Sequence, residues 1–101
     1  MTKFEHKVLK LVALIPKGKV TTYQIIAEKL GSKKLTRAVG NALPKNPSLI
    51  EIPCHRVVKS NGELGFYVLG LAKKKSLLQD EGIRIKGKQI LDFPKYLYDF
   101  N

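Results

Sequence analysis

The chain of 101 residues is long enough for one domain with a modest core and too short for two. Hydrophobic residues make up 44% and charged residues 27%, which excludes a disordered polar chain and predicts a folded domain. Nineteen Lys and Arg against eight Asp and Glu give a formal net charge of +11. This charge points to a polyanionic partner, usually nucleic acid, although a solvated basic surface would give the same count.

A single cysteine excludes an internal disulfide and a multi-cysteine metal site, and it indicates a reducing compartment. The two histidines, His6 and His55, are far apart and have no partners at ligand spacing, so we expect no metal. No apolar run is long enough to span a membrane, and the sequence after Met1 does not resemble a signal peptide. We therefore expect a cytoplasmic protein, associated with the nucleoid if the source is a prokaryote.

The first thirty residues predict two helices. Apolar residues recur at helical spacing over residues 4–15, and Pro16 ends this first amphipathic helix. Thr21, with Gln24 three residues later, has the form of a capping box for a second, short helix. Gly31 ends that helix.

A third helix is predicted over residues 33–43, with Ser32 as its cap. Two short helices joined by a tight turn are typical of a helix-turn-helix, but also of helical hairpins that bind nothing. Ala38 and Gly40 lie beside Arg37, and glycine inside a helix costs about 1 kcal/mol relative to alanine. These small residues suit a helix that approaches either DNA or a neighbouring helix closely.

A turn follows the third helix at residues 44–47, and residues 48–52 read as a short extended stretch. Asn46 precedes a proline in this turn, where its side chain could bond both its own turn and the neighbouring loop. The commoner case is an asparagine that serves its turn alone.

The next turn contains the only cysteine. Pro53 pushes the residue before it into an extended conformation and forces the chain to turn at Cys54. A thiol in the first turn of a short helix lies near free backbone N–H groups, which would favour the thiolate, and the adjacent His55 could take the proton. The alternative is that this lone cysteine is a small buried hydrophobic residue.

The second half of the chain alternates short strands, turns and one helix. Residues 57–58 resume as a strand, residues 60–63 are a hairpin signal, and residues 64–70 form an apolar, glycine-bounded loop or strand. A fourth helix begins near Leu71 and ends before Gly82.

Glu81 lies at the end of that helix, where the helix dipole disfavours a carboxylate. It should therefore have a partner, either a surface lysine or a buried imidazole. Residues 83–85 and 89–91 alternate as two strands around a turn, and residues 93–100 are an aromatic tail that covers the core.

Several motifs together resemble one protein family. Residues 52–58 (Ile-Pro-Cys-His-Arg-Val-Val) resemble the active-site motif of the O6-alkylguanine-DNA alkyltransferases, also called methylated-DNA–protein-cysteine methyltransferases. Four other segments resemble family motifs in the family's order and spacing: residues 15–23, 37–40, 46–47 and 77–82.

This resemblance implies an α/β, mainly helical fold, namely the winged helix-turn-helix of the family's C-terminal catalytic domain with a small β hairpin. Residues 1–101 would be a single DNA-binding catalytic domain without the family's N-terminal domain, which we interpret as a minimal version.

The resemblance further implies that the partner is double-stranded DNA containing alkylated guanine, bound through the minor groove by a monomer that contacts no membrane. Arg37 would enter the base stack and replace an extruded guanine, and Tyr23 would crowd the neighbouring phosphate. The implied DNA-binding residues are Thr22, Tyr23, Thr36, Arg37, Ala38 and Gly40.

The implied reaction is direct repair without a cofactor or metal. Glu81 would orient His55, which would deprotonate Cys54 through a water molecule. The thiolate would take the alkyl group while the Tyr23 hydroxyl donates toward N3 of the leaving guanine, and Asn46 would brace the turn. With no second cysteine to resolve the thioether, each molecule would act once.

The implied base pocket departs from the family pattern. Val57 would read the exocyclic amine with its carbonyl, as would Cys54, and Tyr67, Val68 and Leu69 would cover the base. Family members commonly have Tyr-Ser-Gly-Gly where this chain has Tyr-Val-Leu-Gly. The serine hydroxyl that would bond O6 is missing, but a backbone N–H could still serve O6, so we expect methyl to be accepted. Because leucine narrows the pocket, we expect bulky groups such as benzyl to be rejected.

Two alternatives belong to other functional classes. Alkyltransferase-like proteins share the fold and flip alkylated bases without repairing them, but they typically lack the reactive cysteine. A general winged-helix binding module with an inert, buried Cys54 would also fit the charge.

Overall fold

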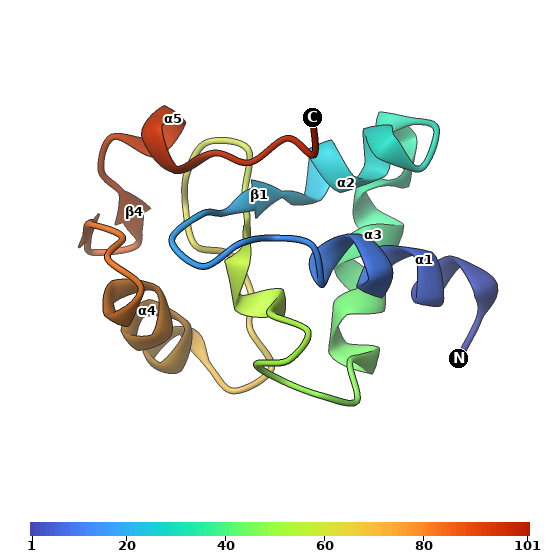
Figure 1. Ribbon diagram of the computed structural model, residues 1–101, viewed down its shortest axis with the longest axis horizontal. Helices are drawn as coiled ribbons and strands as arrows, with labels where there is room; N and C mark the ends of the chain where they lie inside the picture. Colours follow the sequence, from blue (N-terminus) through green and yellow to red (C-terminus); the bar gives the residue numbers. More distant parts are fainter.

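A computed structural model describes residues 1–101, and its helices and strands form two groups (Figure 1). Helices α1, α2 and α3 gather at one end, and α4, α5 and a small hairpin at the other. The elements, in chain order, are α1 (Lys3–Val12), β1 (Thr21–Thr22), α2 (Tyr23–Lys29), α3 (Thr36–Ala42), β2 (Val57–Val58), α4 (Leu71–Asp80), β3 (Ile85–Lys86), β4 (Gln89–Ile90) and α5 (Phe93–Tyr96). Three single-turn 3-10 helices are η1 (Lys33–Leu35), η2 (Leu43–Lys45) and η3 (Cys54–Arg56).

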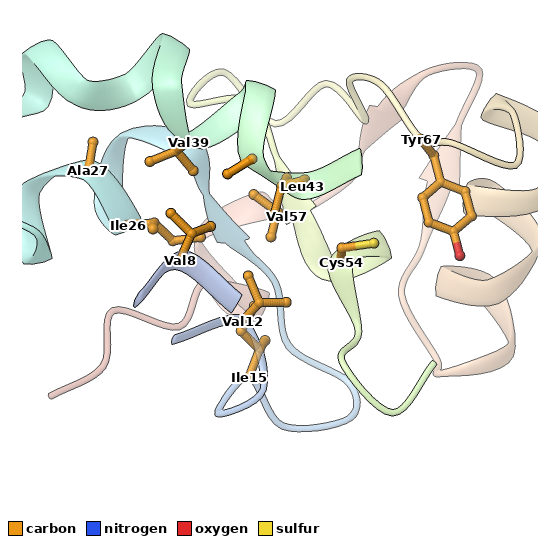
Figure 2. Packing of buried hydrophobic residues seen from close by; sticks show 11 residues of the cluster. Val8, Val12, Ile15, Ile26, Ala27, Val39, Leu43, Cys54, Val57 and Tyr67 are labelled. Atoms are coloured by element: carbon orange, nitrogen blue, oxygen red, sulfur yellow. The ribbon is translucent and has the colours of Figure 1, made fainter. Parts of the chain in front are cut away.

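The two-residue strand β2 separates two hydrophobic cores. It pairs in parallel with β1, so that Thr21 lies opposite Val57 and Thr22 opposite Val58. Val57 belongs to the core of α1, α2 and α3 (Figure 2), whereas Val58 belongs to the core beneath α4 and the hairpin. Successive side chains of a strand point to opposite faces, which accounts for this division.

The predicted first, second and fourth helices are confirmed, but the first ends at Val12, before the predicted end at Ile15, and the start of the second differs. Thr22, and not Thr21, caps α2 by accepting the N–H of Ile25 at 3.0 Å. Helix α1 begins with a capping box that the sequence analysis missed, in which the Thr2 hydroxyl and the Glu5 carboxylate each accept the other's backbone N–H.

The predicted third helix is broken into three pieces, and α3 covers only its middle. Ser32 caps the 3-10 turn η1, not the α-helix, by accepting the N–H of Lys34 at 3.1 Å. Leu35 then leaves helical geometry with ψ near 0°, and Pro44 holds the chain in a second 3-10 turn, η2. The turn and helix nevertheless keep the predicted helix-turn-helix arrangement against α2.

The predicted extended stretch over residues 48–52 is wrong. Ile52 donates its N–H to the Ser48 carbonyl at 2.9 Å, and Ile50 has a φ of 81°, so this segment is a tight turn. Residues 64–70 form a loop, and β3 and β4 form the predicted hairpin. The aromatic tail also covers the core as predicted, since Tyr98 and Phe100 pack on the first hydrophobic cluster.

The fold is thus helix-rich with two small sheets, as the sequence predicts. None of its helices combines the length and the apolar character that crossing a membrane requires.

Candidate active site

Cys54 opens the short helix η3 at the junction of the two cores. Its N–H bonds the Ile52 carbonyl at 2.8 Å. The Asn46 side chain donates to the same carbonyl at 2.7 Å and accepts the N–H of Ser48 at 2.8 Å. Asn46 therefore ties its own turn to the cysteine turn, as predicted.

The sulfur is buried beside a narrow cavity. Cys54 is 5% exposed and lines a cavity of about 10 Å³ whose other lining residues are mostly apolar. Figure 2 shows the sulfur on the side of the first core that faces Tyr67. The remaining lining residues are Leu43, Pro44, Phe66, Tyr67 and Val68. A purine is far larger than this space, so a base would reach the sulfur only after movement of residues 64–70, here called the covering loop.

Burial of the thiol raises the pKa of Cys54, which contradicts the expectation that the turn favours the thiolate. The Asn46 hydrogen bond and the positive charge of Lys74 oppose this rise without cancelling it. Desolvation wins because a single 3-10 turn offers few free N–H groups, whereas the surrounding side chains are apolar. Activation therefore requires a base.

His55, the residue after Cys54, pairs with Glu81 and is the candidate base. His55 is 2% exposed, and its Nε2 lies 2.9 Å from Glu81 Oε2. Burial lowers the pKa of His55 despite the carboxylate, so the ring is neutral. A neutral ring that donates from Nε2 keeps its lone pair on Nδ1, and Nδ1 has no hydrogen-bond partner. This buried acceptor is free to take a proton.

Arg56 fixes the carboxylate from the other side. Its Nε donates to Glu81 Oε1 at 2.9 Å and its Nη2 to Oε2 at 2.7 Å, while Nη1 donates to the Ile15 carbonyl at 2.8 Å. Burial opposes ionisation of Glu81, but these bonds and the one from His55 outweigh it, and the pKa of Glu81 is lowered. The predicted partner of Glu81 is therefore the buried imidazole, with an arginine that the sequence analysis did not identify.

Lys74 is a second residue that the sequence analysis missed. It is fully buried, and its ammonium donates to the Val57 carbonyl at 2.6 Å and to the Phe66 carbonyl at 3.0 Å. Burial lowers the pKa of Lys74 to about 7. A signal was present, because Lys74 follows Leu71 by three residues and precedes Leu78 by four, on the buried side of α4.

A cleft of about 570 Å³, here called the main cleft, opens between α2, α3 and the covering loop. Arg37 is exposed there and forms no ion pair within the chain. Tyr23 is half-buried, and its hydroxyl donates to the Phe66 carbonyl at 3.5 Å. Desolvation raises the pKa of Tyr23 to about 12, which keeps its proton in place at neutral pH. The lining residues are Tyr23, Thr36, Arg37, Gly40, Asn41, Leu43, Pro44, Lys59 and Phe66.

Two glycines lie near Tyr23 at this cleft, and only one of them marks a close approach. A Cβ on Gly40 would lie 3.9 Å from the nearest atom, in the Tyr23 ring, which is an ordinary contact. Close packing against another part of the chain therefore does not explain Gly40. Gly65 has a φ of 73°, and a Cβ there would lie 2.8 Å from the Tyr23 hydroxyl, so this position requires glycine.

Three further residues, Thr22, Ala38 and Val57, were predicted to contact DNA or the flipped base. Thr22 is 3% exposed and its hydroxyl caps α2, which leaves its backbone for the predicted DNA contact. Ala38 is half-buried on α3 and does not line the main cleft. The Val57 carbonyl, predicted to read the base, already accepts from Lys74.

The covering loop contains the remaining predicted pocket residues. Tyr67 is buried with an unpartnered hydroxyl, whereas Val68 and Leu69 are 47% and 53% exposed. Nowhere do three His, Cys, Asp or Glu side chains gather closely enough to hold a metal ion.

Comparison with known proteins gives consistent matches. Residues 3–83 match the family model described as 6-O-methylguanine DNA methyltransferase, DNA binding domain. A methylated-DNA–protein-cysteine methyltransferase of Saccharolobus islandicus is 51% identical over 82 residues, which are 81% of this chain and 52% of that protein. The chain thus spans about half the length of the curated relatives it matches.

Two solved structures superpose well. S. pombe Atl1, in complex with damaged DNA containing O6-carboxymethylguanine, matches with a TM-score of 0.85 and 34% identity over 97% of this chain and 96% of that one. Mycobacterium tuberculosis OGT in complex with DNA matches with a TM-score of 0.78 and 39% identity over 81% of this chain and 50% of that one. These matches confirm the fold class that the sequence motifs implied.

Proposed function

The chain belongs to the 6-O-methylguanine DNA methyltransferase family, and from that premise we propose that it transfers a methyl group from O6-methylguanine in duplex DNA to Cys54. The observation that carries this proposal is the state of His55, the residue that follows the only cysteine. Its ring is neutral, its Nδ1 has no hydrogen-bond partner, and its Nε2 is held by Glu81. A buried acceptor of this kind is what a buried thiol with a raised pKa needs.

DNA binding would occur at the main cleft. Arg37 is exposed and unpaired there, next to the small surface of Gly40, so the helix can approach the duplex closely and place the guanidinium into the stack. The alkylated guanine would rotate out past Tyr23 toward the covering loop. Unstacking costs a few kcal/mol and is easiest at a damaged pair, which favours damage over normal DNA.

The covering loop would then have to move aside to admit the base. Phe66 lines both the main cleft and the cavity at Cys54, so its side chain separates the DNA from the sulfur. Gly65 and Gly70 bound the loop with φ values of 73° and 94°. Rotation about these glycines would let the base displace Phe66 and Val68 and reach the sulfur.

The chemical step moves one proton and one alkyl group. The Cys54 proton passes through a water molecule to His55 Nδ1, and Glu81 stabilises the resulting imidazolium. The thiolate attacks the methyl carbon, the carbon–oxygen bond breaks, and its electrons remain on the guanine. Tyr23, which still holds its proton, donates toward N3 of the leaving base. The product is a thioether on the only cysteine, so each molecule would react once.

Intact-mass spectrometry tests this proposal. The chain is incubated with a duplex containing one O6-methylguanine, and the expected result is a mass increase of one CH₂ group on Cys54. The Cys54→Ala variant should bind the duplex without gaining mass. An unchanged mass of the wild-type protein, with DNA binding intact, would refute the transfer.

The second candidate function is damage recognition without repair. It is favoured by the match to Atl1 over nearly the whole of both chains and by the burial of Cys54. Tight binding that prefers the alkylated duplex, without any mass increase, would support this sensor function. Equal affinity for damaged and undamaged duplexes, again without a mass increase, would refute both candidates.

A further inference from the structure

We propose that the DNA backbone contacts a second basic surface that adjoins the main cleft, formed by Lys59 and Lys88 and here called the wing surface. This inference rests on the proposed function in that duplex DNA is the ligand. It extends the interface to two residues that lie outside the recognition helix α3 and far from it in sequence.

The wing surface is built on a rigid frame. Lys59 begins a tight turn that is closed by its N–H to the Glu63 carbonyl at 2.9 Å. The hairpin of β3 and β4 docks on this turn, since Leu64 donates its N–H to the Lys88 carbonyl at 2.9 Å. A further backbone bond joins Ile90 to Gly62 at 3.0 Å. Two lysines separated by 29 positions in the sequence are thereby held on one surface.

This surface is continuous with the main cleft. A second cleft of about 370 Å³ includes both Lys59 and Lys88 in its lining. It shares Lys59 and Phe66 with the main cleft, so the two hollows meet along one wall. A duplex seated on α3 presents a phosphate charge about every 1.7 Å along its axis, and its backbone therefore continues toward the second cleft.

Both lysines are available to a phosphate. They are exposed, and neither has a carboxylate within ion-pair distance. Glu63 lines the same cleft, but its carboxylate accepts from the Asn61 amide at 2.9 Å. Lys86 adds another exposed charge at the adjacent hairpin turn. Cations on a rigid turn are typical phosphate contacts, which fix the register of a protein on DNA without reading sequence.

The test compares two double variants that remove equal charge. Lys59→Gln with Lys88→Gln alters the wing surface. Lys7→Gln with Lys10→Gln alters exposed positions of α1, where Lys10 lines a shallow pocket that shares no residue with either cleft. Circular dichroism confirms that both variants fold, and affinity for an unmodified duplex is then measured over a range of salt concentrations.

The plot of log affinity against log salt concentration should become shallower by about 2 for the wing variant, because each lost phosphate contact removes about 0.9 from the slope. The α1 variant should keep the wild-type slope. Equal slopes for the two variants would show a general effect of net charge and would overturn the inference, as would a wild-type slope in the wing variant.

This readout is separate from alkyl transfer. A wild-type protein that binds the unmodified duplex but never methylates Cys54 would refute the proposed reaction, and the comparison of slopes would still decide the wing surface. A wild-type protein that does not bind duplex DNA at all would refute both.

Discussion

Replacing Lys74 by methionine should change how the stability of the protein depends on pH. In the folded protein the Lys74 ammonium is fully buried between α4 and the covering loop, with two backbone carbonyls as its partners. Burial lowers its pKa from 10.5 to about 7. Methionine has a similar length and no charge, so Lys74→Met removes the titration while nearly keeping the volume.

The direction of the effect follows from proton binding. Between the two pKa values the unfolded chain holds a proton that the folded chain has released, so the free energy of unfolding rises with pH. One proton corresponds to about 1.4 kcal/mol per pH unit, which gives about 2 kcal/mol between about pH 7.5 and about pH 9. At higher pH the raised pKa values of Cys54, Tyr23 and Tyr67 act in the opposite direction, so the comparison stops there.

Urea unfolding at several pH values measures the effect. Wild type should gain stability across this window more steeply than Lys74→Met, and the exposed neighbour variant Lys73→Met should follow wild type. Parallel pH profiles for wild type and Lys74→Met would refute the reasoning. An NMR titration of the Lys74 ammonium in the wild-type protein tests the same pKa without any substitution.

Three further substitutions probe the site. Gly40→Ala should raise the free energy of unfolding by up to about 1 kcal/mol in a urea titration, because alanine favours the helix and its Cβ has room. The same substitution should weaken binding to an alkylated duplex. Unchanged affinity would argue against close approach of DNA. Glu81→Gln should lose about 2 kcal/mol of stability at neutral pH by urea titration, because Arg56 loses its carboxylate, and it should reduce the loss that wild type shows as the pH falls below 4.5. A wild-type acid profile in that variant would contradict the lowered carboxyl pKa. Asn46→Ala should raise the pKa of Cys54 further, so that iodoacetamide modifies the thiol only at higher pH than in wild type, and superimposable profiles would refute the Asn46 contribution.

The helices that depend on local patterns were predictable from the sequence. Apolar spacing located α1, α2 and α4, and Gly31 and Gly82 located the ends of α2 and α4, whereas α1 ends at Val12, earlier than Pro16 suggests. The predicted third helix was wrong in extent because a proline at residue 44 and a break at Leu35 favour tighter turns over a continuous helix. Periodicity alone does not show such breaks, since 3-10 and α turns place apolar residues at nearly the same spacing.

Only those contacts of the site that involve residues of the recognised sequence motifs were predictable. The turn at Cys54, the bond of Asn46 and the pairing of His55 with Glu81 follow from the sequence motifs. The raised pKa of the thiol and the burial of Lys74 depend on what packs around them in three dimensions. Three lysines in a row look like a solvated stretch, and only the placement of Leu71 and Leu78 on the same side of α4 indicates that the middle one points inward.

The distribution of the site residues over the two hydrophobic cores has a further consequence. Cys54 packs in the first core and His55 follows it in η3, whereas Glu81 caps α4, whose Leu78 belongs to the second core. Arg56 joins the two parts through its bonds to Glu81 and to the Ile15 carbonyl. In a molecule whose halves have come apart, His55 would lack its carboxylate, and the proton transfer proposed above would lose its support. The proposed alkyl transfer would therefore require that both halves of the domain are packed together.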